Sequence, residues 1–85
     1  MQIEYSPRFI KKFQKLSKVD YQLKQNIIST IEIFQNNPNY PSLRLHKLSK
    51  TDSWSISVNM RIRILFVYLT NDEVLLVDIG GHEIY

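Results

Sequence analysis

The 85-residue chain has no cysteine and only two glycines. Without cysteine it can form neither disulfides nor a thiolate metal site. It also lacks an apolar run of the ~18 residues that a membrane-spanning helix requires. Its first residues do not pair a basic segment with an apolar one, as a signal peptide would. We therefore expect a cytoplasmic protein that has no membrane partner.

Sequence signatures of several enzyme classes are missing as well. The two histidines, His46 and His82, lie far apart, outside any HExxH motif and away from any acidic cluster. There is no glycine-rich phosphate loop, and no serine stands in a nucleophile-elbow sequence. The sequence thus predicts no metal site, no cofactor and no nucleotide hydrolysis of the phosphate-loop type.

Size and charge favour a small domain with an acidic or polyanionic partner. Hydrophobic residues make up 44% and charged residues 22%, both ordinary for a folded protein, and the length allows one core, so we expect residues 1–85 to form a single domain. The net charge is +3, a mild basic bias. Basic side chains crowd the first predicted helix and the middle of the chain: Arg8, Lys11, Lys12, Lys15, Lys18, Arg44, Lys47, Lys50, Arg61 and Arg63.

The first half of the chain predicts a strand and a helical hairpin. Alternating apolar and polar residues over 2–5 indicate a short strand. A serine–proline pair at 6–7 marks the start of an amphipathic helix, which we expect to end near Leu16. A capping-box sequence at 17–20 then begins a second helix, and the asparagines and prolines of 35–41 end it.

The second half reads as strands separated by short polar turns. Residues 43–48 alternate imperfectly, which is typical of a short or edge strand, whereas 54–59, 61–69 and 74–79 are clear strand candidates. Short turns predict antiparallel pairing. The predicted fold is α+β: an N-terminal strand and a helical hairpin, with the helices packed on one face of a four- or five-stranded, mainly antiparallel sheet whose other face is partly open.

Polar groups of chemical interest fall on that open face and at the end of the last strand. If Ile62 and Ile64 face the helices, Arg61 and Arg63 emerge on the open face, where arginine is disfavoured unless it is paired or holds an anion. After the last strand, a double glycine predicts a freely turning bend. Beyond it, residues 82–85 present an imidazole, a carboxylate and a phenol.

Arginine, histidine and aromatic residues together suit cleavage of a phosphodiester without a metal. Arginine can neutralise a phosphate as negative charge builds up on it. Histidine can transfer protons near neutral pH. Aromatic rings can stack on the bases of single-stranded RNA.

Three segments carry a resemblance to a known family. Residues 55–66, SISVNMRIRILF, resemble the Ser-Ile-x-Val/Ile-Asn-x-x-x-Arg-Ile-x-Phe stretch of the RelE/ParE superfamily, the toxins of bacterial toxin–antitoxin pairs. The ending LLVDIGGHEIY, residues 75–85, is similar to the Gly-Thr-His-x-x-x-Phe/Tyr tail of the YafQ-like branch, and LHKL, residues 45–48, to its histidine-bearing segment. The resemblance covers essentially the whole chain, and the fold it implies agrees with the one that the patterns predict.

The resemblance implies a ribosome-dependent endonuclease that cuts mRNA in the A site. In such enzymes the ribose 2′-OH attacks the adjacent phosphate, so the nucleophile belongs to the substrate and the protein supplies orientation and charge stabilisation. The implied partners are mRNA, the ribosome with its RNA, and a cognate antitoxin that forms a hetero-oligomer with the toxin and covers the open sheet or the helical hairpin.

The resemblance also implies a role for individual residues. Arg63 would hold the scissile phosphate and stabilise the pentacoordinate transition state. His82 would act as general acid or base, and His46 would be the second proton-transfer group. Tyr85 would orient the phosphate or stack on the base. Substrate or ribosomal RNA binding would fall to Arg61, Lys47, Trp54 and the lysines of the first helix.

Two other functions stay open at this point. A ParE-like protein would bind DNA gyrase and cleave no RNA, and a catalytically silent module would bind only the antitoxin. The gyrase-binding branch generally lacks the paired histidine and the terminal aromatic residue, so His46, His82 and Tyr85 favour the nuclease.

Structural roles compete with the catalytic ones. Arg63 could form a surface salt bridge with Asp78 or Glu83, while His82 could cap the sheet. His46 could be an exposed spacer, and Trp54 could belong to the core. The tail is also one residue shorter between histidine and aromatic ring than the YafQ-like spacing, which on a strand would turn the ring to the opposite face.

Overall fold

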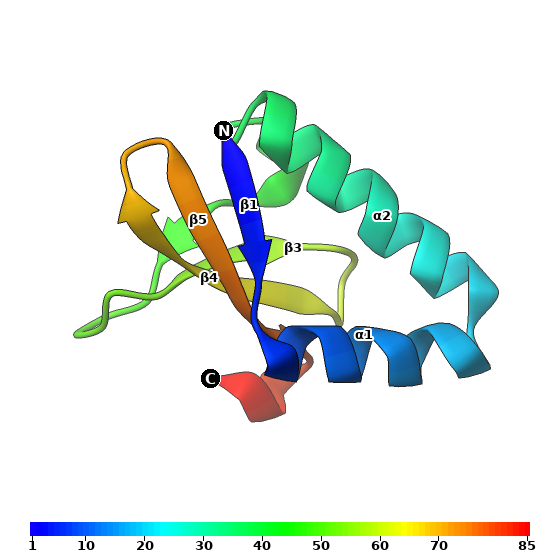
Figure 1. Ribbon diagram of the computed structural model, residues 1–85. Helices are drawn as coiled ribbons and strands as arrows, with labels where there is room; N and C mark the ends of the chain where they lie inside the picture. Colours follow the sequence, from blue (N-terminus) through cyan, green and yellow to red (C-terminus); the bar gives the residue numbers. More distant parts are fainter.

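Two helices lie against one face of a five-stranded sheet (Figure 1). The structure, a computed structural model, describes all 85 residues. The strand order is β1-β5-β4-β3-β2, with β1 parallel to β5 and the other pairs antiparallel, which confirms the predicted α+β fold. The elements are β1 (Gln2–Tyr5), α1 (Pro7–Val19), α2 (Tyr21–Asn36), the 3-10 turn η1 (Pro41–Leu43), β2 (His46–Lys47), β3 (Trp54–Ser57), β4 (Arg63–Thr70), β5 (Glu73–Gly80) and the 3-10 turn η2 (His82–Ile84).

The predicted start of α1 is confirmed. The Ser6 hydroxyl accepts a hydrogen bond from the Phe9 N–H (3.0 Å), and proline follows at the first helical position, where its missing N–H leaves no bond unmade. The same hydroxyl donates to the Val77 carbonyl (3.0 Å). The helix cap therefore also attaches α1 to β5.

The boundary between the two helices differs from the prediction. The first helix continues to Val19 rather than ending near Leu16, so Ser17 lies inside it. Asp20 alone forms the break, with extended backbone, and its carboxylate accepts a hydrogen bond from the Leu23 N–H (3.0 Å). Aspartate at 20 is as good a helix cap as serine at 17, and the longer α1 gains a further turn of hydrogen bonds.

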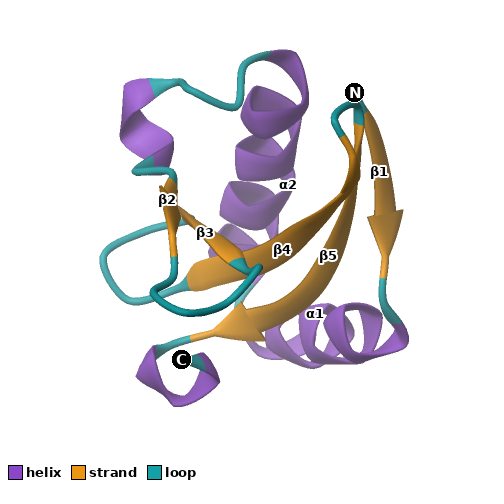
Figure 2. Ribbon diagram, turned by 90° about the vertical axis from the view of Figure 1, so that its left-hand side faces the viewer, coloured by secondary structure: helices purple, strands orange, loops and turns teal.

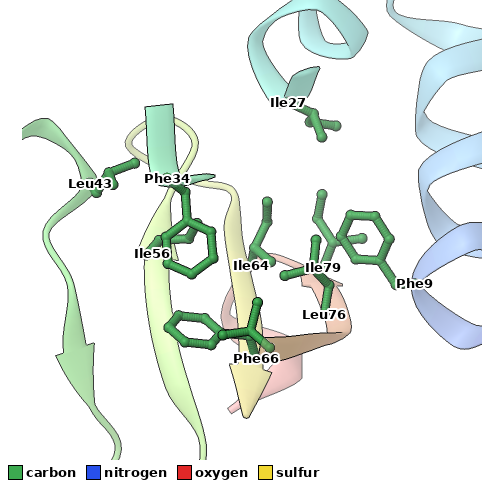
Figure 3. Packing of buried hydrophobic residues seen from close by; sticks show 10 residues of the cluster. Phe9, Ile27, Phe34, Leu43, Ile56, Ile64, Phe66, Leu76 and Ile79 are labelled. Carbon is green, nitrogen blue, oxygen red and sulfur yellow. The ribbon is translucent and has the colours of Figure 1, made fainter. Parts of the chain in front are cut away.

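A core of ten buried side chains joins the helices to the sheet (Figure 3). Phe34 of α2 packs on Phe66 of β4 with ring centroids 4.7 Å apart. Ile56 and Ile64 are fully buried beside them, and strand alternation therefore turns their neighbours to the face away from the helices. The other members are Phe9, Ile27, Leu43, Val74, Leu76 and Ile79. No helix has the length and apolarity that crossing a membrane would require.

The middle strands are shorter than predicted. The candidate at 43–48 is reduced to His46–Lys47, preceded by a 3-10 turn and by Arg44 in a left-handed conformation (φ 48°). The candidate at 61–69 begins only at Arg63, because Asn59 organises a turn before it. The Asn59 side-chain oxygen accepts hydrogen bonds from the N–H groups of Arg61 and Ile62, both at 2.8 Å. Arg61 thus lies in a turn and not, as predicted, on the open face of a strand.

Candidate functional site

Two serines of β3 hold the guanidinium of Arg63. Arg63 opens β4, and the alternation that buries Ile64 turns its side chain to the face away from the helices, which Figure 2 shows toward the viewer. Its Nε donates to the Ser55 hydroxyl and its Nη1 to the Ser57 hydroxyl, the latter at 2.8 Å. Both serines are buried. Two hydrogen bonds from adjacent edges of a planar group fix its orientation.

The remaining edge of the guanidinium meets His46 and Arg44. Nη2 of Arg63 donates to the Arg44 carbonyl (3.3 Å) and lies 3.4 Å from Nδ1 of His46. His46 pairs with Ser55 across β2 and β3, which places it on the same face of the sheet. Its Nδ1 is also 3.3 Å from the Arg44 carbonyl, so it accepts from Arg63 in one tautomer and donates to Arg44 in the other. The predicted pair of Arg63 and His46 is thus brought together.

Arg63 carries its positive charge without a carboxylate partner. Burial of the guanidinium lowers the pKa of Arg63, and the positive charge of Arg44 lowers it further. Both effects disfavour the cation, although arginine stays protonated at neutral pH. Asp78 pairs instead with Lys12 (2.8 Å) and Arg8 (3.8 Å). The alternative of a salt bridge from Arg63 to Asp78 or Glu83 is therefore wrong, and an anion is the partner this guanidinium lacks.

The C-terminal tail leaves the sheet beside Arg63. Gly80, the last residue of β5, pairs directly with Arg63 of β4. The chain then forms the turn η2, with the Tyr85 N–H donating to the His82 carbonyl (3.2 Å). A 3-10 turn repeats every three residues, so the His82 and Tyr85 rings lie on the same side, 6.0 Å apart and nearly perpendicular. The expectation that the short spacing turns the Tyr85 ring away is wrong, because the tail is not a strand.

Gly80 allows a close approach of the tail, and neither glycine forms a left-handed bend. Neither has a positive φ. A Cβ atom on Gly80 would lie 2.5 Å from Oε1 of Glu83 and 2.8 Å from Cγ2 of Ile84. The Gly81 N–H donates to the same Glu83 oxygen (2.9 Å). This hydrogen bond, followed by one from the N–H of Glu83 itself, lowers the pKa of the Glu83 carboxyl.

We expect Glu83→Ala to loosen the tail without changing the core. Because the folded-state pKa of Glu83 lies below its ordinary value of 4.5, the carboxylate stabilises the tail fully above that pH and less as the pH falls through the lowered pKa. Exchange of the Gly81 amide hydrogen should be about tenfold faster in the variant. NMR hydrogen exchange measures this, with the exposed Glu4→Ala as the matched control; equal Gly81 exchange rates in wild type and Glu83→Ala would contradict the role of the carboxylate.

A hollow of about 130 Å³ brings most of the predicted site together. Arg61 and Arg63 line it from one direction, and His82 and Tyr85 from the tail. Gly81 and Met60 complete its wall. His46 reaches the same guanidinium from β2. The hollow therefore combines positive charge with an exposed imidazole and phenol, an arrangement that can hold a phosphate and move protons around it.

Lys47 and Trp54, predicted as substrate-binding residues, lie outside this hollow. They line a separate depression with Asp52, Val67 and Tyr68. The Trp54 ring packs edge-on against Tyr68 with centroids 5.7 Å apart and rests on the edge of the core. Trp54 is half-buried, with one part against the core and another lining the depression, so its role in binding stays a prediction.

Sequence reasoning missed the residues that orient Arg63. Ser55 and Ser57 flank Ile56, so their common face could have been read from the strand alternation. The Arg44 carbonyl had no comparable signal, because it depends on the left-handed backbone at that residue.

Solved structures of similar shape are bacterial toxins. The YoeB/ParE toxin from Agrobacterium tumefaciens has a TM-score of 0.81 at 12% identity, covering 96% of this chain and 99% of its own. The YoeB-YefM toxin-antitoxin complex from Staphylococcus aureus matches at 0.77 and 15% identity, over 96% and 97%. The E. coli DinJ-YafQ complex matches at 0.75 and 21% identity, over 98% and 94%. No family model and no curated protein sequence matches the chain. Because these identities are low, the comparison establishes the fold alone. The chain has the fold of the RelE/ParE-type toxins.

Proposed function

We propose that this protein is the toxin of a toxin–antitoxin pair and that it cleaves mRNA on the ribosome without a metal. The observation that carries the proposal is the Arg63 guanidinium: serines fix its orientation and no carboxylate neutralises it, and Arg63 lines a hollow shared with His82 and Tyr85. The fold, which is that of YoeB and YafQ toxins, supports the same conclusion.

Arg63 would bind the scissile phosphate. In the pentacoordinate transition state, negative charge increases on the non-bridging phosphate oxygens, and a nearby guanidinium stabilises it. Because Ser55 and Ser57 already orient the group, little reorganisation is needed when the charge develops. This preorganisation is the main contribution expected from the protein.

The two histidines approach Arg63 from opposite sides of β4, the strand that Arg63 begins. His46 comes from β2, beyond β3, whereas His82 follows β5 on the other side of β4. Transfer by attack of the 2′-OH needs a base at the nucleophile and an acid at the leaving group, in line across the phosphorus. One imidazole would take the 2′-OH proton as the O2′–P bond forms. The other, protonated, would give a proton to the 5′ oxygen as the P–O5′ bond breaks, leaving a 2′,3′-cyclic phosphate and a 5′-OH.

Tyr85 and Arg61 would position the nucleotide around that phosphate. Tyr85 is about half exposed, and its ring is available for stacking on a base. Arg61 is exposed in the turn after β3 and lines the same hollow. Their contribution is to binding and orientation rather than to bond making.

Primer extension on mRNA from cells that briefly express the protein tests the proposal. We expect new cuts within translated reading frames, and the same cuts with purified ribosomes in a buffer whose only divalent cation is the Mg²⁺ that the ribosome itself needs. Growth arrest without cuts would contradict the nuclease and direct attention to gyrase, through a supercoiling assay. Neither cuts nor arrest would leave a module that only binds an antitoxin.

A groove on the helical hairpin is the surface we propose for the antitoxin. It has a volume of about 580 Å³ and lies between α1 and α2, next to β1. Tyr5, Ile10 and Ile28 line it, each more than a third exposed. The groove itself is lined by one basic and one acidic residue, Lys24 and Glu32, while α1 on one side of it carries five basic side chains and no acidic one, two of them paired with Asp78. These features fit an amphipathic antitoxin segment that has acidic residues beside its apolar face, in line with the toxin–antitoxin complex seen for YoeB of S. aureus.

We expect Ile28→Asp to weaken antitoxin binding about a hundredfold while cleavage is unchanged. The substitution places a charge in the apolar groove, but at a side chain already exposed to water, so folding should survive. Titration calorimetry with the purified antitoxin measures the affinity. Tyr21→Asp is the matched control, since Tyr21 is exposed on the same helix outside the groove. Equal affinity of Ile28→Asp and wild type would place the antitoxin elsewhere.

A further inference from the structure

The arginines around the turn after β3 have no acidic partners. The three ion pairs of the structure join Asp72 and Asp78 to the N-terminus, Arg8 and Lys12, so Arg44, Arg61 and Arg63 pair with no carboxylate. Like charges gathered without counterions are unfavourable in the free protein. Arg61 and Arg63 border the hollow assigned to the scissile phosphate, which leaves the charge of Arg44 unexplained.

Arg44 belongs to a second hollow beside the first. This hollow, of about 240 Å³, is lined by Arg44, by the polar residues Ser42, Ser57 and Asn59, and by Val58. Met60 is the one residue that lines both hollows. The one side-chain contact of the Arg44 guanidinium is with the Met60 sulfur (3.9 Å), a weak acceptor, so its N–H groups are free for a stronger one.

The backbone of Arg44 links the two hollows. Arg44 adopts a left-handed conformation (φ 48°, ψ 48°), which is unfavourable for a residue with a Cβ atom. In this conformation its carbonyl accepts from Nη2 of Arg63, while its side chain extends to Met60 and the second hollow. One residue thus orients the guanidinium of the first hollow and supplies the positive charge of the second.

We propose that Arg44 forms a second phosphate subsite, which binds the phosphodiester next to the one held by Arg63. The inference rests on the proposed function, because it takes the ligand to be an RNA strand. A strand passing over Met60 would place consecutive phosphates at the two guanidinium groups, and the hydroxyls and amide of the second hollow supply further hydrogen bonds to phosphate oxygens.

Binding of short RNAs that cannot be cleaved tests the subsite directly. The ligands are a 2′-O-methyl dinucleotide with one phosphate and a 2′-O-methyl trinucleotide with two. Affinities are measured by NMR at millimolar concentrations, following the backbone amide signals of Ser57 and Met60, which line the hollows and are present in the wild type and in every variant. We expect the trinucleotide to bind about tenfold more tightly than the dinucleotide. A trinucleotide with one linkage replaced by an uncharged methylphosphonate should bind like the dinucleotide, which separates the phosphate from the third base.

The variant Arg44→Gln should lose this preference. We expect its affinity for the trinucleotide to fall about tenfold and its affinity for the dinucleotide to change less than twofold. Lys50→Gln removes the same charge from an exposed turn with a similar backbone (φ 62°) and should keep the preference. Equal affinities for both ligands in the wild type, an equal loss for both in Arg44→Gln, or binding of neither ligand would overturn the subsite.

The result of this binding experiment does not depend on whether the protein cleaves mRNA, since none of these ligands can be cut. If the protein prefers the trinucleotide tenfold but cleaves no mRNA, the Arg44 subsite is supported and the nuclease activity is contradicted. Cleavage of messages by a protein without the preference would remove only the subsite.

Discussion

Arg63→Ala is expected to abolish RNA cleavage and with it growth arrest, with a loss in rate of about a thousandfold. The guanidinium is held in one orientation by Ser55, Ser57 and the Arg44 carbonyl, and Arg63 lines the hollow proposed for the phosphate. Without it, the charge that develops on the phosphate oxygens has no preorganised partner. Single-turnover cleavage of ribosome-bound mRNA gives the rate, and growth after induction gives the toxicity.

Arg63→Lys is the control that separates charge from geometry. Lysine keeps the positive charge but carries its donors on a single nitrogen and lacks the planar fork that reaches the two serines and a phosphate in separate directions, so we expect it to recover only a small part of the rate. Thermal unfolding must confirm that both variants fold, because alanine leaves the hydroxyls of two buried serines without their donor. A folded Arg63→Ala protein with full toxicity would show that phosphate binding by Arg63 is not part of the activity.

The fold was predictable because its determinants are periodic and apolar. The expectation that Ile64 faces the helices is confirmed by its burial; Ile56 of β3, which pairs with it, is buried as well, and this core fixes the register of the sheet. Strand alternation places Arg63 on the opposite face, so its exposure to a ligand followed from the burial of its neighbour. Where apolar residues recur at a regular period, the sequence was sufficient to predict the strand and the face that it buries.

The errors fall where a single side chain decides the backbone. Asn59 ends the strand pattern by accepting two backbone N–H bonds, which moves Arg61 into a turn. Asp20 competes successfully with Ser17 for the helix boundary. The strand end at Asn59 and the helix boundary at Asp20 each depend on a local hydrogen bond with one side chain. Several neighbouring residues could have made the same kind of bond, and the period of the apolar residues does not show which of them does.

The conformation of the C-terminal tail was wrongly predicted for a different reason. The sequence predicted polar groups with a chemical role after the two glycines, and that role stays a prediction, whereas the glycines themselves were wrongly explained by backbone freedom. Glu83 folds back onto Gly81, and this contact between side chain and backbone produces the 3-10 turn. The turn, in turn, places His82 and Tyr85 together beside Arg63. Spacing arguments that assume a strand cannot anticipate such a contact.

His82→Gln is expected to slow cleavage about a hundredfold while folding and ribosome binding stay intact. Glutamine keeps a polar side chain of similar reach at the exposed rim of the hollow but cannot exchange a proton near neutral pH. If one histidine acts as base and the other as acid, the rate of the wild type should depend on pH as a bell-shaped curve, and His82→Gln should lose one limb of it.

His46→Gln should then lose the other limb, because His46 reaches the same guanidinium from the opposite side of β4. Single-turnover rates measured across the pH range for wild type and both variants test this assignment. Loss of the same limb in both variants would mean that the two histidines do not divide the acid and base roles. An unchanged profile in His82→Gln would move proton transfer away from the tail, leaving His82 as a neighbour of Tyr85 that only shapes the hollow.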